Sequence, residues 1–493
     1  MSSGIPVTDE IQGNLNIRDF SGTGLHGNLL VERNLTIGGS ILGRGATPDW
    51  VNARSAAYGA LGDGVTDDTA AIQAALNAAR PGQVVYLPQG TYAVTAPLTV
   101  PASVVMSGSS GNVLSLTSYG SILKPLASWA QGGAAAAAVL LLASATEEQK
   151  IQDLTIDGSS LPVVADGINS QGAASVYLAN LAIDNVTGNA VNQGASSAAW
   201  RAYQITAHRA GLSGFVLNGS DQSWLECIAQ GCGQTAGAAN TTPGWSIATC
   251  SNSQFSGCRS ENTTGLGNGF TYSGANSAST GVQFAGCSTN FNGGHGIEIT
   301  SSSNSGSGPV TLTGCRFGGD GFNPYPSGTG GGNFAGIFIT NVNSPVLVSG
   351  CAVVPAAANA GHAPQYGISL SSANGSGRGR VQIADSLLWG NTGPLLTDGS
   401  TLLRIAPSCV LSSGAGSAPV HTALTGQAVL VAGSVVVACP VVTAGSRILL
   451  TSQVPGGTPG WLQVSARAAG TSFTITSSSS TDTSTVGYAV EVA

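Results

Sequence analysis

The sequence predicts an all-β protein whose main body is a right-handed parallel β-helix, and three observations favour this fold. A phrase of alternating apolar residues ending in glycine and cysteine recurs through the middle of the chain, at residues 253–258, 282–287, 310–315 and 346–351. Its cysteines stand 29, 28 and 36 residues apart. Such a period is typical of a solenoid whose coils bury their apolar faces against one another. Each coil holds two or three short strand patterns and no helical periodicity.

Composition and charge limit the function classes. The 493 residues include 71 glycines, 42% are hydrophobic and 8% are charged, which describes an apolar stack with a neutral polar surface. The net charge of −7 is spread thinly and no run of lysine and arginine occurs, so we expect no nucleic-acid partner. No apolar run approaches the roughly 18–20 residues of a membrane helix, so we expect no membrane insertion. The N-terminus lacks the basic and apolar regions of a secretory signal, so assembly in a cytoplasm is expected.

The nine cysteines are predicted to be free thiols. Cys258, Cys287, Cys315 and Cys351 share one position of the repeat and should stack as small packing residues. Neighbouring coils lie about 4.8 Å apart, which would allow a disulfide, but the missing secretory signal favours reduced cysteines. No C-x-x-C pair occurs and no histidine repeats with the ladder, so we predict no metal site and no other cofactor.

Residues 1–48 are predicted to form a separate attachment segment. Short alternating strands at 13–17, 27–31 and 34–37 are parted by glycine, and they are too brief to make a stable domain alone. Intertwining with copies of the same chain would bury them, so a parallel homotrimer is expected. The segment resembles the shaft-like N-termini of phage tail fibres and spikes. That resemblance implies a virion tail location, with a tail or baseplate protein as partner.

The β-helix is expected over residues 49–392, and its start carries a specific resemblance. Residues 58–76 combine a Gly- and Asp-rich turn with a helical pattern, and residues 82–92 add a strand. Both stretches resemble the opening of the pectate-lyase-like superfamily, which includes many phage tailspike depolymerases. A capping helix is predicted near 67–80, with Thr66 as its N-cap.

Three aspartates near the start of this helix could be taken for a catalytic or metal-binding cluster. Asp63 lies in the Gly-rich turn, and Asp67 and Asp68 come where the helix begins. Carboxylates at a helix N-terminus stabilise the local structure. We therefore predict that these residues serve the turn and the cap.

Successive coils can be aligned on the cysteine position. The residues placed there are Leu154, Leu181, Ile205, Cys227, Cys258, Cys287, Cys315, Cys351 and Ser386. Long steps in this series mark inserted loops, the clearest at 318–332, and loops on a rigid scaffold concentrate function. We expect a neck at 393–425 and a small antiparallel β-sandwich tip at 426–493, for trimerisation or receptor binding. The tip resembles the C-terminal modules of phage-type tail proteins.

The alignment gathers polar residues on one face of the β-helix. In the strand at 296–299 the two isoleucines should point inward and Glu298 outward. His295 precedes this strand, and Asn268 holds the corresponding place one coil earlier. The Gly-His-Gly at 294–296 resembles a segment of polygalacturonase-type β-helix hydrolases, whose Asn-Thr-Asp and Asp-Asp motifs are missing here.

Candidate site residues follow from this alignment. The predicted catalytic residues are Glu298, Asp320, His295 and Glu261, and the predicted substrate-binding residues are Arg259, Arg316, Phe322, Tyr325 and Asn268. Glu298 with Glu261 or Asp320 is the preferred carboxylate pair, and Glu226 is a further acid. Arg259 and Arg316 should lie about 10 Å apart on one face, where they could bind uronates or phosphates. The alternative is a solvated turn for His295 and ordinary surface charges for the rest.

Aromatic residues offer a second means of binding sugars. Trp200, Trp224 and Trp245 could stack on sugar rings, although Trp224 falls on an inward position and is predicted to be core. The sequence contains no G-x-S-x-G nucleophile motif and no phosphate-binding loop, so carbohydrate chemistry remains. Three functions stay open: a tailspike that binds or also cleaves a host surface polysaccharide, a non-catalytic receptor-binding tail fibre, and a cellular pectate-lyase-like enzyme.

Overall fold

The computed structural model describes residues 49–492 except for short stretches. These stretches are 111–119, 133–135, 144–147, 171, 195–196, 236–240, 249, 275–280, 301–307, 322–333, 341, 343, 355–363, 372–379, 391, 398–401, 414–419 and 440. The attachment segment expected at residues 1–48 lies outside the described part. Residues 48–493 form one compact unit.

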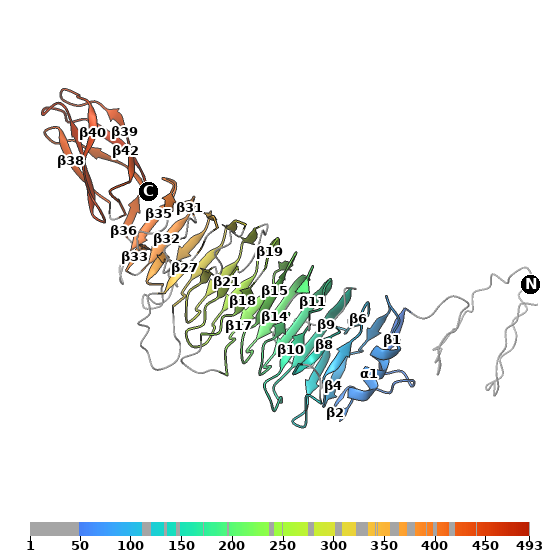
Figure 1. Ribbon diagram of the computed structural model, residues 1–493. Helices are drawn as coiled ribbons and strands as arrows, with labels where there is room; N and C mark the ends of the chain where they lie inside the picture. Colours follow the sequence, from blue (N-terminus) through green and yellow to red (C-terminus); the bar gives the residue numbers. More distant parts are fainter. Residues whose placement is uncertain are drawn as a thin grey trace, which may run out of the picture. The chain divides into compact units, whose positions relative to one another are not determined.

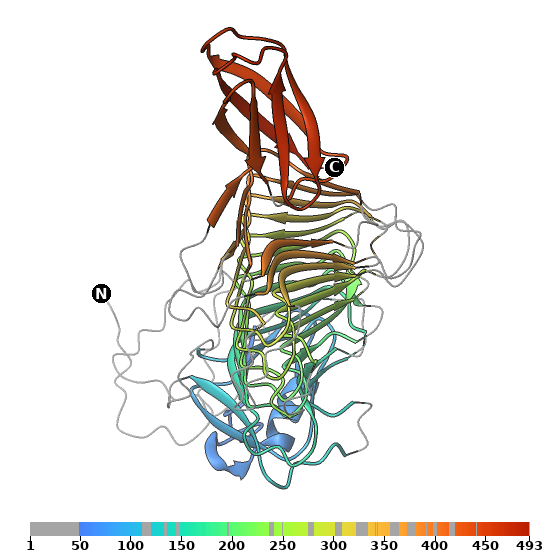
Figure 2. The same cartoon turned by 90° about the vertical axis from the view of Figure 1, so that its left-hand side faces the viewer.

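Parallel strands of successive coils stack into three columns (Figure 1, Figure 2), which confirms the predicted β-helix. The first column contains β1 (Trp50–Asn52), β3 (Val84–Tyr86), β6 (Val105–Ser107), β16 (Ser223–Leu225), β19 (Ser253–Ser256), β22 (Val282–Ala285), β25 (Val310–Thr313), β28 (Val346–Ser349), β31 (Arg380–Ala384) and β34 (Leu402–Ile405). The second column contains β2 (Asp63–Asp67), β4 (Gly90–Val94), β7 (Ser121–Pro125), β17 (Ile228–Gln230), β20 (Arg259–Glu261), β23 (Ser288–Asn290), β26 (Arg316–Gly318), β29 (Ala352–Val354), β32 (Leu387–Gly390) and β35 (Val410–Ser413). The long strands β9 (Gln149–Asp157), β11 (Val176–Asp184) and β14 (Arg201–His208) run through both columns.

The third column forms a separate sheet. It contains β5 (Leu98–Val100), β8 (Ala138–Leu142), β10 (Asp166–Asn169), β12 (Val191–Asn192), β15 (Phe215–Ser220), β18 (Trp245–Ala248), β21 (Phe270–Ser273), β24 (Ile297–Thr300), β27 (Ala335–Thr340), β30 (Tyr366–Ser371) and β33 (Gly393–Thr397), with β13 (Ser197–Ala198) beside β15. The first two columns belong to a 24-stranded sheet and the third to a 12-stranded one.

A left-handed backbone conformation marks the corner between the first and second columns. The corner residues with positive φ include Glu226 (54°), Gly257 (63°), Gly286 (61°), Gly314 (63°), Gly350 (63°) and Asp385 (51°). Side chains other than those of Gly, Asn and Asp are disfavoured in this conformation. The recurring Gly-Cys of the sequence is therefore the mark of this corner, and the cysteine that follows it turns into the core.

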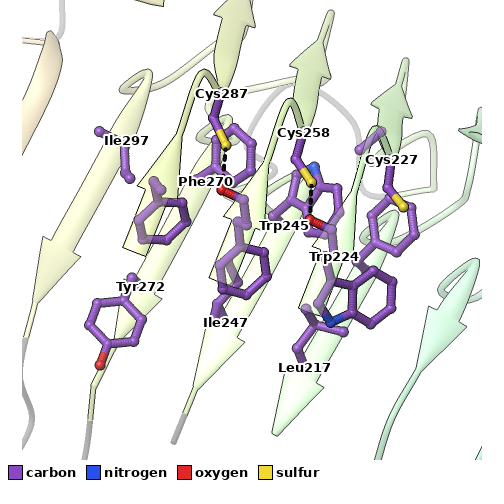
Figure 3. Packing of buried hydrophobic residues seen from close by; sticks show 14 of the residues in the cluster. Leu217, Trp224, Cys227, Trp245, Ile247, Cys258, Phe270, Tyr272, Cys287 and Ile297 are labelled. Atoms are coloured by element: carbon purple, nitrogen blue, oxygen red, sulfur yellow. Dashed lines mark hydrogen bonds between the residues drawn. The ribbon is translucent and has the colours of Figure 1, made fainter. Parts of the chain in front are cut away.

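The cysteines form a packed ladder inside the coils (Figure 3). Cys258 donates its Sγ–H to the backbone carbonyl of Trp224, one coil earlier, at 3.4 Å, and Cys287 does the same to Phe255 at 3.4 Å. All nine cysteines are free, and the four of the repeat are buried, as predicted; the other five are buried as well. The predicted alignment of coils on the cysteine position is also correct at its first two residues, since Leu154 pairs with Leu181.

Aromatic side chains fill the space beside the cysteines. Trp200, Trp224 and Trp245 are fully buried, at 0% exposure. Phe215 stacks on Trp245 with ring centroids 3.9 Å apart, and Trp224 meets Trp245 edge to face at 5.8 Å. The three tryptophans therefore belong to the core, and none is available to stack on a sugar.

The capping helix α1 (Thr69–Ala78) lies at the start of the β-helix (Figure 1) and buries Ile72, Ala75 and Leu76. It begins later than predicted, because its N-cap is Asp68 and not Thr66. No helix among the described residues is long and apolar enough to cross a membrane.

The aspartates beside this helix hold the preceding turn. The Asp68 carboxylate accepts the backbone N–H groups of Leu61 at 2.6 Å and Gly62 at 2.9 Å. Asp63 Oδ1 accepts the N–H of Val65 at 2.9 Å, and this bond helps to keep the pKa of Asp63 below its usual value. The predicted turn role is confirmed for Asp63 and Asp68, whereas the Asp68 side chain makes no hydrogen bond that caps the helix.

Parallel coils continue beyond residue 392, where the sequence analysis placed a neck. β33 pairs with β30, β34 with β31 and β35 with β32. Val410 pairs with Leu387, so Cys409 continues the cysteine column after Ser386. The predicted boundary is too early because these coils lack the Gly-Cys phrase. β36 (Val420–Ala423) then pairs antiparallel with β35.

The C-terminal domain is the predicted antiparallel β-sandwich. One sheet has the order β37 (Thr425–Val429), β42 (Thr485–Glu491), β39 (Arg447–Val454), and the other β38 (Ser434–Ala438), β41 (Ser472–Ser477), β40 (Leu462–Ala468). The sheets meet where Phe473 packs edge to face on Tyr488 at 5.3 Å. Arg404 of the last coil pairs with Glu491 of this domain, with Nε and Oε1 2.5 Å apart.

Candidate functional site

Asn268, His295 and Glu298 form a connected polar group on the outer side of the third column. The backbone N–H of His295 donates to Asn268 Oδ1 at 2.8 Å. The amide of Asn268 donates to Glu298 Oε2 at 2.8 Å and to Thr271 Oγ1 at 3.0 Å. The outward placement of Glu298 and its proximity to Asn268 and His295 match the prediction. Asn268 bonds to both of the other residues and holds them in place.

The His295 ring is fixed between a backbone group and two aromatic rings. Its Nδ1 accepts the N–H of Ala335 at 2.9 Å, so the proton of the neutral ring lies on Nε2. Phe338 stacks on the imidazole at 4.3 Å and Phe334 meets it edge to face at 5.2 Å. Burial lowers the pKa of His295 to about 4, so the ring is neutral at physiological pH and offers an N–H donor.

Glu298 is the ionisable outward residue of its strand. Burial raises the pKa of this half-buried carboxyl above its usual value, and the hydrogen bond from Asn268 opposes part of that rise. A carboxyl that holds its proton more tightly suits a general acid, which must donate a proton near neutral pH.

The neighbours of Glu298 in the sheet are uncharged. The strand register places Thr271 one coil before it and Phe338 one coil after it, with Ser369 following. No second carboxylate stands in this register position among the described strands of the column. Nor do the described residues contain a group of three or more His, Cys, Asp and Glu that could hold a metal ion. The arrangement can bind a polar ligand and donate one proton.

Asp320 lies in the interior, which corrects the expectation that it faces solvent beside Glu298. It is 0% exposed, and its carboxylate accepts from Thr289 Oγ1 at 2.5 Å and from Asn292 Nδ2 at 2.9 Å. Burial raises its pKa to about 7. The glycine-rich turn at 318–321 directs this side chain into the coil, where it joins Asn292 in a buried polar group.

Arg259, Glu261 and Arg316 lie on the second column and not on the face of Glu298. The register places Arg259 and Arg316 two coils apart with Ser288 between them, as the sequence indicated. Glu261 forms an ion pair with Arg259, with Oε1 and Nη1 3.6 Å apart. The preferred pair of Glu298 with Glu261 is therefore split between two columns.

The remaining predicted site residues are Phe322, Tyr325 and Glu226. Phe322 and Tyr325 lie in the stretch 322–333, outside the described residues. Glu226 sits at a left-handed corner and accepts a hydrogen bond from Gln204 Nε2 at 3.0 Å.

A polar group on the second column was not predicted from the sequence. Asp184, nearly fully buried, accepts from His208 Nδ1 at 2.8 Å and pairs with Arg209 Nη2 at 3.3 Å. Asp184 and His208 share one register position, so aligning strand ends as well as the cysteine position would have found them. Each partner of the group is within the chain, and we assign it to holding neighbouring coils together.

Two family matches cover different parts of the chain. Residues 50–265 match the family described as rhamnogalacturonase A/epimerase, pectate lyase-like. Residues 422–491 match the C-terminal domain of K1 capsule-specific polysaccharide lyase.

Individual proteins are also similar to this chain, in sequence or in fold. Mannuronan C5-epimerase AlgE3 of Azotobacter vinelandii is 32% identical over 179 residues, which are 33% of this chain and 9% of that protein. The A-module of epimerase AlgE6 from the same organism superposes with a TM-score of 0.50 and 17% identity, covering 74% of this chain and 100% of the module. The Dettilon tailspike protein gp208 gives a TM-score of 0.42 and 12% identity, covering 90% of this chain and 94% of that one.

The curated epimerases match over a small share of their own length, 9% and 12%. The likeness to the AlgE6 module concerns the fold. The three strand columns and the likeness to this module show that the chain is a parallel β-helix protein, and its residues 50–265 are similar to the pectate-lyase-like family.

Proposed function

We propose that this protein is a phage-type tailspike or tail fibre whose β-helix binds a host cell-surface polysaccharide. The observation that carries the proposal is the match of residues 422–491 to the C-terminal domain of a capsule-specific polysaccharide lyase. The residues of that match directly follow the β-helix. Residues 50–265 of the β-helix match a family named after enzymes that act on polysaccharides. In this proposal residues 1–48 attach the chain to a tail or baseplate protein, and the virion tail is its location.

The outer side of the third column is the proposed glycan-binding face. The side chains beside Glu298 in the sheet are the hydroxyl-bearing Thr271 and the aromatic Phe338, both partly exposed. Hydroxyl groups exchange hydrogen bonds with sugars, and an aromatic ring offers them an apolar face. Glu298 and the Nε2–H of His295 supply an acceptor or acid and a donor at the centre of this face.

Binding is better supported than cleavage. Glycoside hydrolysis uses two carboxyl groups, about 5–5.5 Å apart for retention and about 6.5–9.5 Å for inversion. Glu298 has no second carboxylate in its register position among the described strands, since Asp320 is interior and Glu261 lies on another column. A depolymerase would therefore have to complete its site from another subunit, which a homotrimer would allow.

The test compares the parent protein with Glu298→Gln and with Glu148→Gln, a matched control on an exposed glutamate away from this face. Binding and chain shortening of purified capsule and lipopolysaccharide glycans are measured for all three. If the protein cleaves, Glu298→Gln should lower turnover by about a hundredfold or more, because it removes the proton donor. Glu148→Gln should leave turnover unchanged.

The second candidate is a non-catalytic receptor-binding tail fibre, favoured by the isolation of Glu298. It predicts glycan binding without release of shorter chains for the parent protein. Cleavage that survives Glu298→Gln would move the active site away from this face. Failure to bind any surface glycan would refute the proposed function.

A further inference from the structure

We propose that a polar groove at the corner between the third and first columns is a second glycan subsite, selective for uncharged, hydroxyl-rich chains. The inference rests on the proposed function, since it assigns the ligand to the same class. The groove has a volume of about 470 Å³, within the range of small-ligand sites. Arg201, Asp221, Ser223, Asn252, Gln254 and Gln283 line it.

The rim of the groove is a ladder of side chains, one from each of several successive coils. Ser223 pairs with Arg201 on one side and with Gln254 on the other, and Gln254 pairs with Gln283. These residues therefore occupy one register position on four successive coils. Neighbouring positions are about 4.8 Å apart, so the ladder repeats its polar groups along the axis as an extended sugar chain repeats its hydroxyls.

The floor of the groove is rigid because its polar groups are satisfied within the chain. Gln222 is 2% exposed, and its Nε2 donates to Gln193 Oε1 at 2.8 Å and to the carbonyl of Gly219 at 2.9 Å. Its Oε1 accepts from the indole of Trp224 at 2.7 Å. Ser253, also buried, donates to the carbonyl of Ser251 at 2.8 Å.

Two glutamines of the rim differ from the floor in being unpaired. Gln254 and Gln283 are exposed, and in the described part of the chain neither side-chain amide has a hydrogen-bond partner. Each amide carries a carbonyl oxygen and an NH₂ group, the combination that binds two neighbouring hydroxyls of a sugar. The hydrogen-bonded floor keeps its shape while the two amides are free to bind a ligand. Binding would therefore require little reorganisation of the protein.

Charge at one end of the groove is balanced, which favours an uncharged ligand. Arg201 Nη1 donates to the carbonyls of Asp221 at 2.8 Å and Trp200 at 3.2 Å, which fixes the guanidinium there. The Asp221 carboxylate accepts from Asn252 Nδ2 at 2.5 Å, and this bond keeps the pKa of Asp221 below its usual value. Asp221 is therefore ionised beside Arg201, and their opposite charges leave no net attraction for a uronate or a phosphate.

The groove is separate from the face that carries Glu298. Its ladder belongs to the first column, and Glu298 belongs to the third. The two sites can therefore be altered independently.

The experiment titrates the full chain with short uncharged gluco-, manno- and galacto-oligosaccharides and with an oligomannuronate. The test variant is the double substitution Gln254→Ala with Gln283→Ala. The matched control is Gln382→Ala, an exposed glutamine in the same ladder position farther along the column. Loss of the two amides should weaken binding of the uncharged ligand about tenfold, since together they remove hydrogen bonds worth about 1.4 kcal/mol.

The outcomes separate the groove from the proposed function. Gln382→Ala should bind the uncharged ligand as the parent does, and both variants should keep the parent melting temperature. If the double variant binds as tightly as the parent, the groove is not a subsite, while the proposed function stands. A parent that binds only the oligomannuronate would refute the ligand class. If the parent binds no glycan at all, both proposals fail.

Discussion

At the scale of single residues, Asp320 has the clearest pH-dependent effect on stability. Burial raises its pKa to about 7, whereas an aspartate in an unfolded chain titrates near about 3.9. Between these pH values the folded protein holds a proton that the unfolded chain has lost. The contribution of Asp320 to the free energy of unfolding therefore falls as the pH rises through this range, by at most about 1.4 kcal/mol per pH unit.

His295 acts in the opposite direction. Its pKa of about 4 lies below that of a free histidine, about 6.5, so here the unfolded chain binds the extra proton. Its contribution to stability therefore rises with pH between these values. From about pH 4 to 6.5 the two groups partly cancel, and from about pH 6.5 to about 7 the effect of Asp320 remains.

Asp320→Asn should remove the loss of stability that occurs as the pH rises from about 6.5 to about 7. Urea unfolding followed at several pH values measures this slope, and Asp385→Asn is the control, since Asp385 sits at a left-handed corner that asparagine also tolerates. An unchanged slope in Asp320→Asn would show that another group titrates in this range.

Cys287 is predicted to serve packing alone. It is 2% exposed, and its thiol donates to the carbonyl of Phe255 at 3.4 Å. Cys287→Ala should lower the free energy of unfolding by about 1 kcal/mol, from lost apolar contact, with glycan binding unchanged. Cys287→Ser is the control, because Ser386 already occupies this column and donates to the carbonyl of Ala384 at 2.7 Å.

Thiol titration gives a second measure of the cysteine ladder. Burial raises the pKa of the Cys258 thiol well above its usual value, so the folded protein should react slowly with a thiol reagent. The unfolded chain should yield nine reactive thiols without a reducing agent. A lower number would reveal disulfides and contradict the packing role.

At the scale of elements, the corner glycines determine the bend between the first and second columns. A Cβ added at Gly286 would have no heavy atom within 4 Å, yet its φ is 61°. Backbone conformation, and not space, therefore explains this glycine. Gly286→Ala should cost about 1 kcal/mol of stability.

Substituting asparagine for Gly286 distinguishes backbone conformation from lack of space as the reason for this glycine. Gly286→Asn should cost less than Gly286→Ala although asparagine is larger, because asparagine tolerates the left-handed conformation. Thermal unfolding of both variants measures the difference. A larger loss for asparagine than for alanine would point to crowding at the corner.

The elements that repeat were predictable from the sequence, and the site was predictable only in part. Alternation within strands fixes which side chains point inward, so Glu298 could be placed outward from its isoleucine neighbours. Asp320 follows a glycine-rich turn, where no alternation tells inside from outside, and its burial could not be foreseen. Glu298 and Glu261 are separated because they lie on different strands of their coils. An alignment on the cysteine position alone does not show which strand of a coil a residue belongs to.

At the scale of the whole molecule, exposed apolar side chains on the C-terminal domain support the proposed homotrimer. Trp461 is 87% exposed, Val431 73% and Leu449 69%, and Val429 is 55% exposed on the same sheet as Leu449. Apolar groups of this size on one small domain are typical of a surface that meets another protein. A copy of the same chain is the partner we expect, since a trimer would cover these residues and bring three β-helices side by side.

Leu449→Glu should therefore dissociate the assembly, because a buried unpaired carboxylate costs several kcal/mol. Light scattering of the parent at micromolar concentration should give three times the chain mass of 48.7 kDa, and the variant should give the single mass. Thr451→Glu adds the same charge two residues farther along the exposed side of β39 and serves as the control for charge alone. If both variants dissociate, the interface extends along β39. A parent that is already monomeric would refute the trimer, and any active site completed between subunits would be refuted with it.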